Sequence, residues 1–256
     1  MKIEGKIAVV TGGAGGIGRA LAERFAQEGA KAVAVADVQE AALGAVADEI
    51  GGLAVPCDVT READIQRLVR EAESAFGPID IFCSNAGIAR MGGEDTDDAL
   101  WQQNWDLHVM AHVYAARALA PGMAARGSGY FVNTASAAGL LSHVQSATYS
   151  VTKHAAVAFA EWLSIAYGDR GVRVSVLCPQ AVRTAMIRGL EEDVASLDGV
   201  LEPEQVAGSV IEAMEREDFL ILPHPEVQTY MQRKTADCDR WLKGMRKLRA
   251  AYGTAD

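Results

Sequence analysis

A tyrosine and a lysine four residues apart form the pair in this sequence best suited to proton transfer. Tyr149 and Lys153 lie in a stretch of helical periodicity, so the two side chains share one face of the helix. A free tyrosine titrates near pH 10, so it must lose about two to three pKa units, roughly 3–4 kcal/mol, to exchange a proton with a substrate near neutrality. An adjacent ammonium favours the phenolate. The pair alone is weak support, because most such pairs are ordinary helix surface.

A serine thirteen residues before the tyrosine could complete a site with this pair. Ser136 comes just after the apolar run 130–133, and ligands bind at strand ends in an open α/β sheet. Its hydroxyl could donate to a substrate oxygen and polarise a carbonyl group. An isolated serine in such a place is more often a turn or cap residue.

Five glycines between a strand and a helix predict a phosphate-binding turn at residues 11–18. Glycine lets the backbone turn tightly and lets a pyrophosphate approach the amides at the positive end of the helix. A strand before the glycines and a helix after them are the context that this motif requires. The alternative is a tight turn without a ligand. We expect cofactor contacts from Gly12, Gly15, Gly16, Ile17 and Gly18.

An acidic residue at the end of the second apolar run favours NAD over NADP. Asp37 lies nineteen residues after Gly18, near the offset expected for an acid that binds the adenosine ribose hydroxyls. A carboxylate there would repel a 2′-phosphate, and no lysine or arginine lies within the glycine turn or at positions 38–39. The alternative is that Asp37 caps the helix that starts near Gln39.

Seven short apolar runs alternate with longer stretches of helical periodicity. Most runs are apolar throughout, which is typical of strands covered on both faces of a parallel sheet. This order predicts an α/β fold: a doubly wound parallel sheet (Rossmann fold) of about seven strands with helices on both faces. The expected strands are 7–10, 32–36, 53–55, 79–83, 130–133, 172–177 and 219–222. The expected helices are 17–27, 39–49, 62–76, 98–125 and 147–168.

Length and charge narrow the possible classes of protein. The 256 residues contain no repeat or long linker, so we expect one domain, 1–256. The net charge of −10 argues against a nucleic-acid surface, which needs clustered lysine and arginine. The four cysteines are scattered without metal-ligand spacing and suggest free thiols in a reducing compartment. With no signal-peptide core or long apolar stretch, we expect a cytoplasmic protein. Without metal-ligand spacing, we expect no metal site.

Taken in order and at these intervals, the motifs resemble those of the short-chain dehydrogenase/reductase family across nearly the whole chain. The glycine turn fits the cofactor motif of that family, and Asn85, Ala86 and Gly87 fit its N-A-G motif. Asp58 resembles the acid near the adenine, and Ser136, Tyr149 and Lys153 fit the catalytic set in type and spacing.

The resemblance implies a mechanism and a cofactor. Tyr149 would be the general acid and base, Lys153 would hold the nicotinamide ribose and lower the pKa of the tyrosine, and Ser136 would position the substrate oxygen. It also implies a homotetramer or homodimer built on the helices 98–125 and 147–168. The further cofactor contacts implied are Asp58, Val59, Asn85, Ala86, Gly87, Tyr149, Lys153, Pro179, Val182 and Thr184.

Two positions depart from the family pattern. His108 stands where many members carry an asparagine that helps to hold a water of the proton relay, so the ring could hold that water, pass protons itself, or merely pack. Gln180 stands where the family usually has glycine, and could narrow the pocket or bond the substrate. His112 shares a helix face with His108, but no carboxylate lies at metal-ligand spacing.

The substrate side of the sequence is mostly apolar. We expect a hydrophobic secondary alcohol or ketone, with a lid at 186–200 and a basic amphipathic helical extension at 225–256. The extension could pack on its own or a neighbouring subunit, or cover the substrate pocket. The less favoured alternative is that it lies on a membrane surface. The expected activity is hydride transfer with NAD; the alternative is an NAD(H)-sensing regulator. The expected substrate contacts are Ser136, Ala138, Leu140, Gln180 and Met186.

Overall fold

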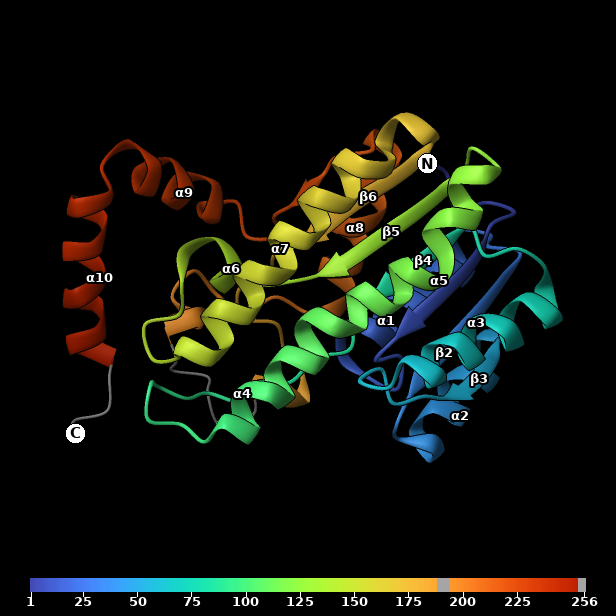
Figure 1. Cartoon of the computed structure of the whole chain (residues 1–256), viewed down its shortest axis with the longest axis horizontal. Helices are drawn as coiled ribbons and strands as arrows, with labels where there is room; N and C mark the ends of the chain where they lie inside the picture. Colours follow the sequence, from blue (N-terminus) through green and yellow to red (C-terminus); the bar gives the residue numbers. More distant parts are fainter. Residues whose placement is uncertain (188–193, 253–256) are drawn as a thin grey trace.

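The seven strands form one parallel sheet in the order β3-β2-β1-β4-β5-β6-β7 (Figure 1). This computed structural model describes residues 1–187 and 194–252. Every expected apolar run contains a strand, and the doubly wound parallel sheet is confirmed. The strands are β1 (Ile7–Thr11), β2 (Ala32–Asp37), β3 (Leu53–Pro56), β4 (Ile81–Ser84), β5 (Gly129–Thr134), β6 (Val172–Leu177) and β7 (Leu220–Ile221).

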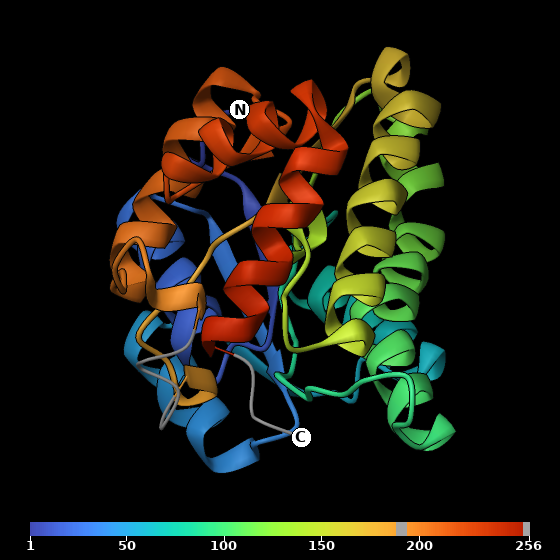
Figure 2. The same ribbon diagram turned by 90° about the vertical axis from the view of Figure 1, so that its left-hand side faces the viewer.

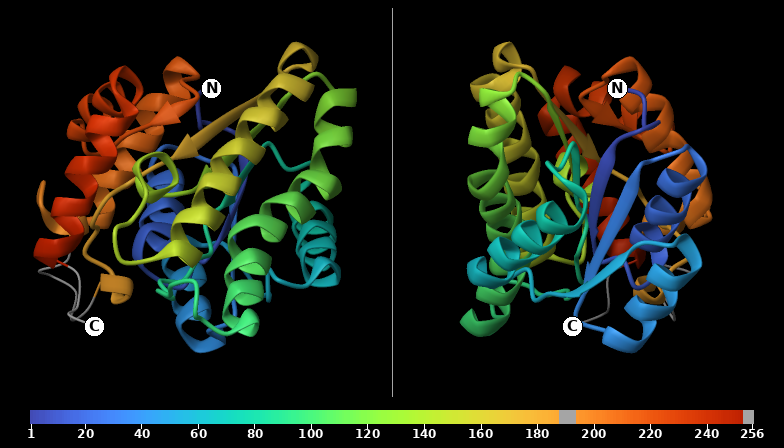
Figure 3. Two further views of the ribbon diagram at one scale, coloured as in Figure 1. Left: turned by 60° about the vertical axis from the view of Figure 1, so that its left-hand side comes forward. Right: turned by 90° about the vertical axis from the view of Figure 1, so that its right-hand side faces the viewer.

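Helices cover both faces of the sheet, which explains why the strands are apolar throughout (Figures 2 and 3). β1 and β5 are buried along their whole length. The helices α1 (Gly16–Gln27), α2 (Glu40–Ile50) and α8 (Pro203–Arg216) pack on one face. The helices α3 (Glu62–Phe76), α5 (Ala111–Ala125) and α7 (Ala147–Tyr167) pack on the other.

The strand order reverses between β1 and β4, and this point positions the candidate site. β2 and β3 lie on one side of β1, whereas β4 to β7 follow on the other. Ligands of open α/β sheets bind at the carboxyl ends of the strands at such a switch point. The glycine turn after β1, the N-A-G motif after β4 and Ser136 after β5 all lie at this edge.

The helix expected at 98–125 contains a change of winding that the periodicity did not show. It consists of α4 (Asp98–Trp105), a π-helical segment (Asp106–Met110) and α5. A π-helical turn inside an α-helix often marks a functional position, and His108 lies in the middle of this one. A further short helix, α6 (Ala138–Leu141), follows Ser136.

The C-terminal extension forms two helices instead of one amphipathic stretch. α9 (Glu226–Ala236) is followed by Asp237. The Asp237 carboxylate accepts a hydrogen bond from the Arg240 amide at 2.9 Å and so caps the start of α10 (Cys238–Tyr252). α10 has no buried residue and lies at one end of the molecule (Figure 1). We call α9 and α10 together the C-terminal arm. Within 1–187 and 194–252, no helix is long and apolar enough to cross a bilayer.

Candidate active site

The glycine turn is packed so closely that four of its five glycines have no room for a side chain, and at Gly12 and Gly18 the obstacle is backbone. Gly12 has φ +67°, and a Cβ there would lie 2.9 Å from the Ala86 Cα atom. A Cβ on Gly18 would lie 2.0 Å from the Gly12 carbonyl oxygen. The amide nitrogen of Asn85 donates to the Thr11 hydroxyl at 2.9 Å, which joins the N-A-G motif to the turn. The first two motifs of the sequence therefore form one unit at the switch point.

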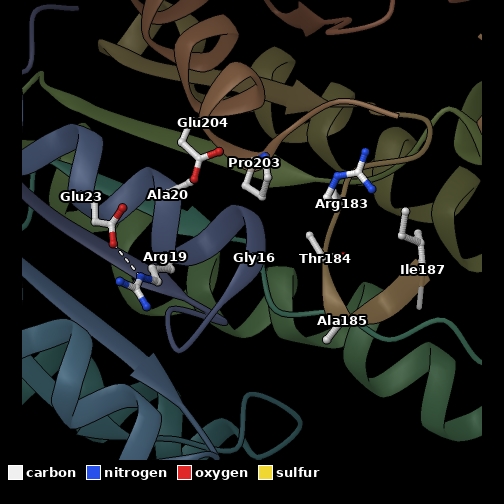
Figure 4. A pocket seen from close by; sticks show the side chains of 10 residues that line it. All are labelled: Gly16, Arg19, Ala20, Glu23, Arg183, Thr184, Ala185, Ile187, Pro203 and Glu204. Atoms are coloured by element: carbon white, nitrogen blue, oxygen red, sulfur yellow. Dashed lines mark hydrogen bonds and ion pairs between the residues drawn. The ribbon is translucent and has the colours of Figure 1, made fainter. Parts of the chain in front are cut away.

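A cavity of about 500 Å³ opens beside the start of α1 (Figure 4). Gly16 and Thr184 both line it and lie close together, since a Cβ on Gly16 would lie 2.9 Å from the Thr184 Cγ2 atom. The first amides of a helix have no partner within the helix, so those of α1 are available to an anion here. A Cβ on Gly15 would meet nothing within 4 Å, so the turn leaves open space where a pyrophosphate would lie. These residues fit a dinucleotide.

The two acids expected near the adenosine are engaged in local hydrogen bonds. The Asp37 carboxylate accepts from the Ala14 amide at 3.2 Å and from the Gln39 amide at 3.0 Å. The N-cap of α2 is Gln39, so Asp37 braces the glycine turn and the loop before α2 without capping the helix. Asp58 accepts from the Thr60 amide and hydroxyl at 3.0 and 2.7 Å. Arg19, the nearest cation to the turn, is bound by Glu23 and Glu49.

Ser136, Tyr149 and Lys153 come together at the ends of β5 and β6. The Ser136 hydroxyl accepts from the Ala138 amide at 3.1 Å and forms a hydrogen bond with the side chain of Tyr149. The Lys153 ammonium lies 5.6 Å from the centre of the Tyr149 ring and donates to the Thr134 carbonyl at 3.2 Å. Ser146 caps α7 by accepting from the Tyr149 amide at 3.1 Å, so the first turn of α7 holds the tyrosine in place.

Burial acts on the two ionisable groups in a way that the sequence did not predict. Burial raises the pKa of Tyr149 above its ordinary value, and the hydrogen bond with Ser136 opposes this only in part. Burial lowers the pKa of Lys153 to about 8. The lysine therefore remains mostly charged at pH 7, but the protein alone does not make the phenol acidic. The lower tyrosine pKa that we expected needs further positive charge at the site.

A second cavity, of about 960 Å³, opens directly onto Ser136 and Tyr149. Of the expected substrate contacts, Ala138, Gln180 and Met186 also line this cavity. Leu140 does not; its side chain packs against the apolar core instead. The C-terminal arm forms one wall of this cavity. Covering the pocket is one of the alternatives that the sequence left open for the extension. Its contributions are Tyr230, Arg233, Ala236, Asp237, Arg240, Trp241, Gly244, Met245 and Leu248.

Comparison with known proteins identifies the family. The model of the family described as short chain dehydrogenase matches residues 6–195. The chain belongs to the short-chain dehydrogenase/reductase family. It is 36% identical over 242 residues to 1-deoxy-11-beta-hydroxypentalenate dehydrogenase of Streptomyces exfoliatus, covering 89% of this chain and 86% of that protein. It is also 36% identical over 219 residues to 2,5-dichloro-2,5-cyclohexadiene-1,4-diol dehydrogenase of Sphingobium indicum, covering 84% of this chain and 87% of that protein.

Solved structures agree with this assignment. A short-chain dehydrogenase/reductase from Burkholderia phymatum in complex with NAD has a TM-score of 0.87 at 30% identity, covering 93% of this chain and 96% of that one. A 3-ketoacyl-(acyl-carrier-protein) reductase from Brucella melitensis complexed with NADH has a TM-score of 0.80 at 29% identity, covering 86% and 97%. Both relatives hold a nicotinamide cofactor.

His108, the first departure from the family pattern, is buried and uncharged. Its Nδ1 atom lies 3.0 Å from the Thr152 hydroxyl, and its Nε2 atom lies 3.1 Å from the Ile88 carbonyl oxygen. Burial, with the nearby charge of Lys153, lowers the pKa of His108 to about 2. The ring packs edge-on against Tyr149, with 5.5 Å between centroids. A histidine that stays neutral across the physiological range does not take up a proton itself, which disfavours one of the three expected roles.

His112, one turn further on, is also neutral, because burial lowers its pKa to about 3. Both of its ring nitrogens are buried without a hydrogen-bond partner among the described residues. In the described part of the chain, no group of three or more His, Cys, Asp or Glu side chains could hold a metal ion.

Gln180, the second departure, bonds a residue of the predicted lid. Its side-chain amide donates to the Asp198 carboxylate at 2.9 Å. Residues 188–193 of the predicted lid lie outside the described residues. The parts on either side form short 3₁₀ turns, Ala185–Ile187 and Val194–Ser196, instead of one helix. No sequence signal could have paired Gln180 with Asp198, because the contact depends on how the chain returns to this loop.

Proposed function

We propose that this protein is an NAD-dependent dehydrogenase or carbonyl reductase for bulky hydrophobic secondary alcohols and ketones. One observation carries the proposal: Ser136, Tyr149 and Lys153 meet beside the glycine turn, and Ser136 and Tyr149 face a largely apolar cavity of about 960 Å³. Cavities of this size accept drug-sized molecules. No observation on the described residues favours the alternative of an NAD(H) sensor.

Each catalytic residue has a defined task in the proposed reaction. The nicotinamide ring, when bound, takes up or gives the hydride. Tyr149 accepts the proton of the substrate hydroxyl during oxidation and returns it during reduction. Ser136 donates a hydrogen bond to the substrate oxygen and stabilises its developing charge. Lys153, still charged at neutral pH, stabilises the phenolate that burial disfavours.

His108 acts on this site as a positioning residue. Its Nε2 atom accepts from the amide of Ile88, in the segment after the N-A-G motif, at 3.3 Å, and its Nδ1 atom donates to the hydroxyl of Thr152, in the first turns of α7, at 3.0 Å. Thr152 in turn donates to the Thr148 carbonyl at 2.9 Å within that helix. The ring therefore fixes the distance between the loop that would hold the cofactor and the helix that carries Tyr149.

The cofactor preference follows from Asp37, which we propose to bind the adenosine ribose. Its carboxylate lies at the carboxyl end of β2 beside the glycine turn and would repel a 2′-phosphate. Arg19 is already paired with two glutamates and offers no free guanidinium to such a phosphate. Asp58, Val59, Asn85 and Val182 would complete the cofactor contacts.

Replacing Asp37 with alanine should weaken NAD⁺ binding by about tenfold, because a charged acceptor for the ribose hydroxyls is lost. The affinity for NADP⁺ should rise or stay constant, because the repulsion is lost as well. Titration of both dinucleotides by calorimetry measures this. Asp48→Ala, an exposed acid on α2, is the matched control and should change neither affinity. An unchanged NAD⁺/NADP⁺ ratio in Asp37→Ala would refute the role.

The activity itself is tested with a panel of secondary alcohols of increasing size, from cyclohexanol to a hydroxysteroid, with NAD⁺ as oxidant. The relatives named above are dehydrogenases of a pentalenate and a cyclohexadiene diol, which supports cyclic substrates. We expect NADH formation, read by its absorbance, with kcat/KM rising with apolar size. Absence of NADH formation with every alcohol, and of NADH consumption with every matching ketone, would contradict the proposed function.

We further propose a cytoplasmic homotetramer or homodimer of one-domain chains. Two large apolar side chains on α7 face outward: Trp162 is 58% exposed and Ile165 is 82% exposed. An outward apolar face on a helix is typical of a surface that a partner covers. α7 is one of the two helices on which the resemblance places the subunit interface.

A further inference from the structure

Two residues that line the substrate cavity are joined by hydrogen bonds to the carboxylate of a third, Asp198. The Tyr230 hydroxyl donates to one oxygen of Asp198 at 2.8 Å, and the Gln180 side-chain amide donates to the other at 2.9 Å. Gln180 follows β6, Asp198 belongs to the lid region and Tyr230 lies on α9. We call these three residues the Asp198 bridge.

One side of the bridge is fixed to the body of the protein. The Ala181 amide donates to the Ala195 carbonyl at 3.1 Å, and the Leu201 amide donates to the Ala181 carbonyl at 3.1 Å. These bonds attach the stretch around Asp198 to the loop after β6 on both sides of the carboxylate. With Gln180 also bound to it, Asp198 is a firm anchor. Tyr230 is the residue that attaches the C-terminal arm to this anchor.

The arm is attached to the opposite rim of the cavity by other hydrogen bonds. The Lys234 ammonium donates to the Leu140 carbonyl at 2.5 Å, and the Arg249 guanidinium donates to the Val144 carbonyl at 2.8 Å. The Leu140 carbonyl belongs to α6 and the Val144 carbonyl to the loop that follows α6, so both lie in the segment before Tyr149. The arm therefore spans the cavity from the Asp198 bridge to this segment. Figures 2 and 3 show α9 and α10 together on one side of the molecule, with α10 in front in Figure 2.

α10 has no fully buried residue; Trp241 packs partly against an apolar cluster around Leu141 and Val227, and the hydrogen bonds above supply further attachment. Its apolar side chains Trp241, Met245 and Leu248 line the cavity and would be covered by a large apolar ligand. The Tyr230 and Trp241 rings lie 6.5 Å apart between centroids, so the position of Tyr230 affects the wall directly. A small alcohol bound at Ser136 and Tyr149 has no need of this wall.

We propose that Tyr230, through Asp198 and Gln180, is a positioning residue that determines substrate size by holding the C-terminal arm as the outer wall of the cavity. This inference rests on the proposed function, since it concerns the same cavity. The bridge selects bulky apolar alcohols because only they contact the wall that it holds. It contributes nothing to the transfer of the proton, which occurs at Tyr149.

The test uses Tyr230→Phe, which removes the bridging hydroxyl and keeps the ring beside Trp241. For the bulkiest alcohol that the protein oxidises, we expect KM to rise about tenfold, as for the loss of a hydrogen bond to a charged group. kcat for that alcohol, and both constants for cyclohexanol, should stay unchanged. Tyr114→Phe on α5, which lies outside the cavity, is the matched control. Asp198→Ala removes the carboxylate that accepts this hydrogen bond, so combining it with Tyr230→Phe should add little further to the rise in KM.

A second measurement examines the arm without any substrate. α9 and α10 contain many lysines and arginines, so trypsin should cleave them several-fold faster in Tyr230→Phe than in the wild-type protein. A bulky-to-small ratio of kcat/KM that Tyr230→Phe leaves unchanged would overturn the selectivity. If the wild-type protein oxidises no alcohol, the proposed function fails. In that case, equal rates of trypsin cleavage of Tyr230→Phe and of the wild-type protein would overturn the role of the Asp198 bridge without any activity measurement.

Discussion

The Tyr149→Phe variant should oxidise the best alcohol of the panel about a thousandfold more slowly than the wild-type protein, because positioned acid–base catalysis contributes roughly 10²–10⁴-fold. Phenylalanine cannot accept or return the proton of the substrate hydroxyl. The ring itself stays, so its edge-on contact with His108 and the packing of α7 should be kept. Steady-state rates of NADH formation measure the effect.

Dinucleotide affinity and fold should survive this substitution. NAD⁺ should bind to Tyr149→Phe within about twofold of the wild-type affinity, since the glycine turn and Asp37 carry most of the proposed contacts. Tyr167→Phe, near the end of the same helix, is the control and should keep full activity. If Tyr149→Phe kept more than a tenth of the wild-type rate, Tyr149 would not be the general acid and base of the reaction.

The pH profile of the same reaction tests why Lys153 is needed. Alcohol oxidation requires the phenolate of Tyr149, so its rate should rise with pH, whereas ketone reduction requires the phenol and should fall. Burial raises the pKa of Tyr149, and in the proposed mechanism the Lys153 ammonium, 5.6 Å from the centre of the ring, stabilises the phenolate against this rise. Removal of that charge by Lys153→Met should therefore move the rising limb of the oxidation profile to higher pH. A limb at the wild-type position would show that another group sets it.

Much of the fold could be predicted because local sequence carried it. The run 172–177 is apolar throughout except for Arg173 and Ser175, and it forms β6 with the expected bounds. The stretch 62–76 has clear helical periodicity and forms α3 with the expected bounds. Tyr149 and Lys153 lie on one face of the strongly patterned helix α7, and Ser136 directly follows the apolar strand β5, so the sequence could place each of them. Their meeting as a catalytic set was what the family resemblance implied.

The features that were not predicted depend on contacts between distant segments or on small local changes. The π-helical segment at 106–110 changes the winding without breaking the helical pattern around His108. Asp237 lies between α9 and α10, but a single acidic residue within an amphipathic pattern does not predict that the helix ends there. α8 was not expected, although Glu202 and Gln205 form a capping box before it. The Asp198 bridge follows from tertiary structure, to which periodicity gives no access, and for the same reason the sequence left the place of the arm open among several alternatives.

The Gly18→Ala variant should lose both stability and dinucleotide affinity, because the new Cβ would lie 2.0 Å from the Gly12 carbonyl oxygen. The obstacle is backbone, so the turn or the start of α1 must shift to make room. Overpacking of this kind costs about 1–3 kcal/mol, or roughly 3–10 °C in Tm for a chain of this size. A displaced turn should also weaken NAD⁺ binding by at least about tenfold, since the amides of α1 then point away from the pyrophosphate.

Gly15→Ala separates the two effects of the glycine turn. Gly15 has extended backbone with φ −172°, and a Cβ there would meet nothing within 4 Å. Its Tm should therefore equal that of the wild-type protein, while any loss of NAD⁺ affinity reports directly on the space reserved for the pyrophosphate. Thermal unfolding with and without NAD⁺ measures both quantities for the two variants. If Gly18→Ala unfolded at the wild-type Tm and bound NAD⁺ normally, the close packing at the switch point would not be what shapes the cofactor site.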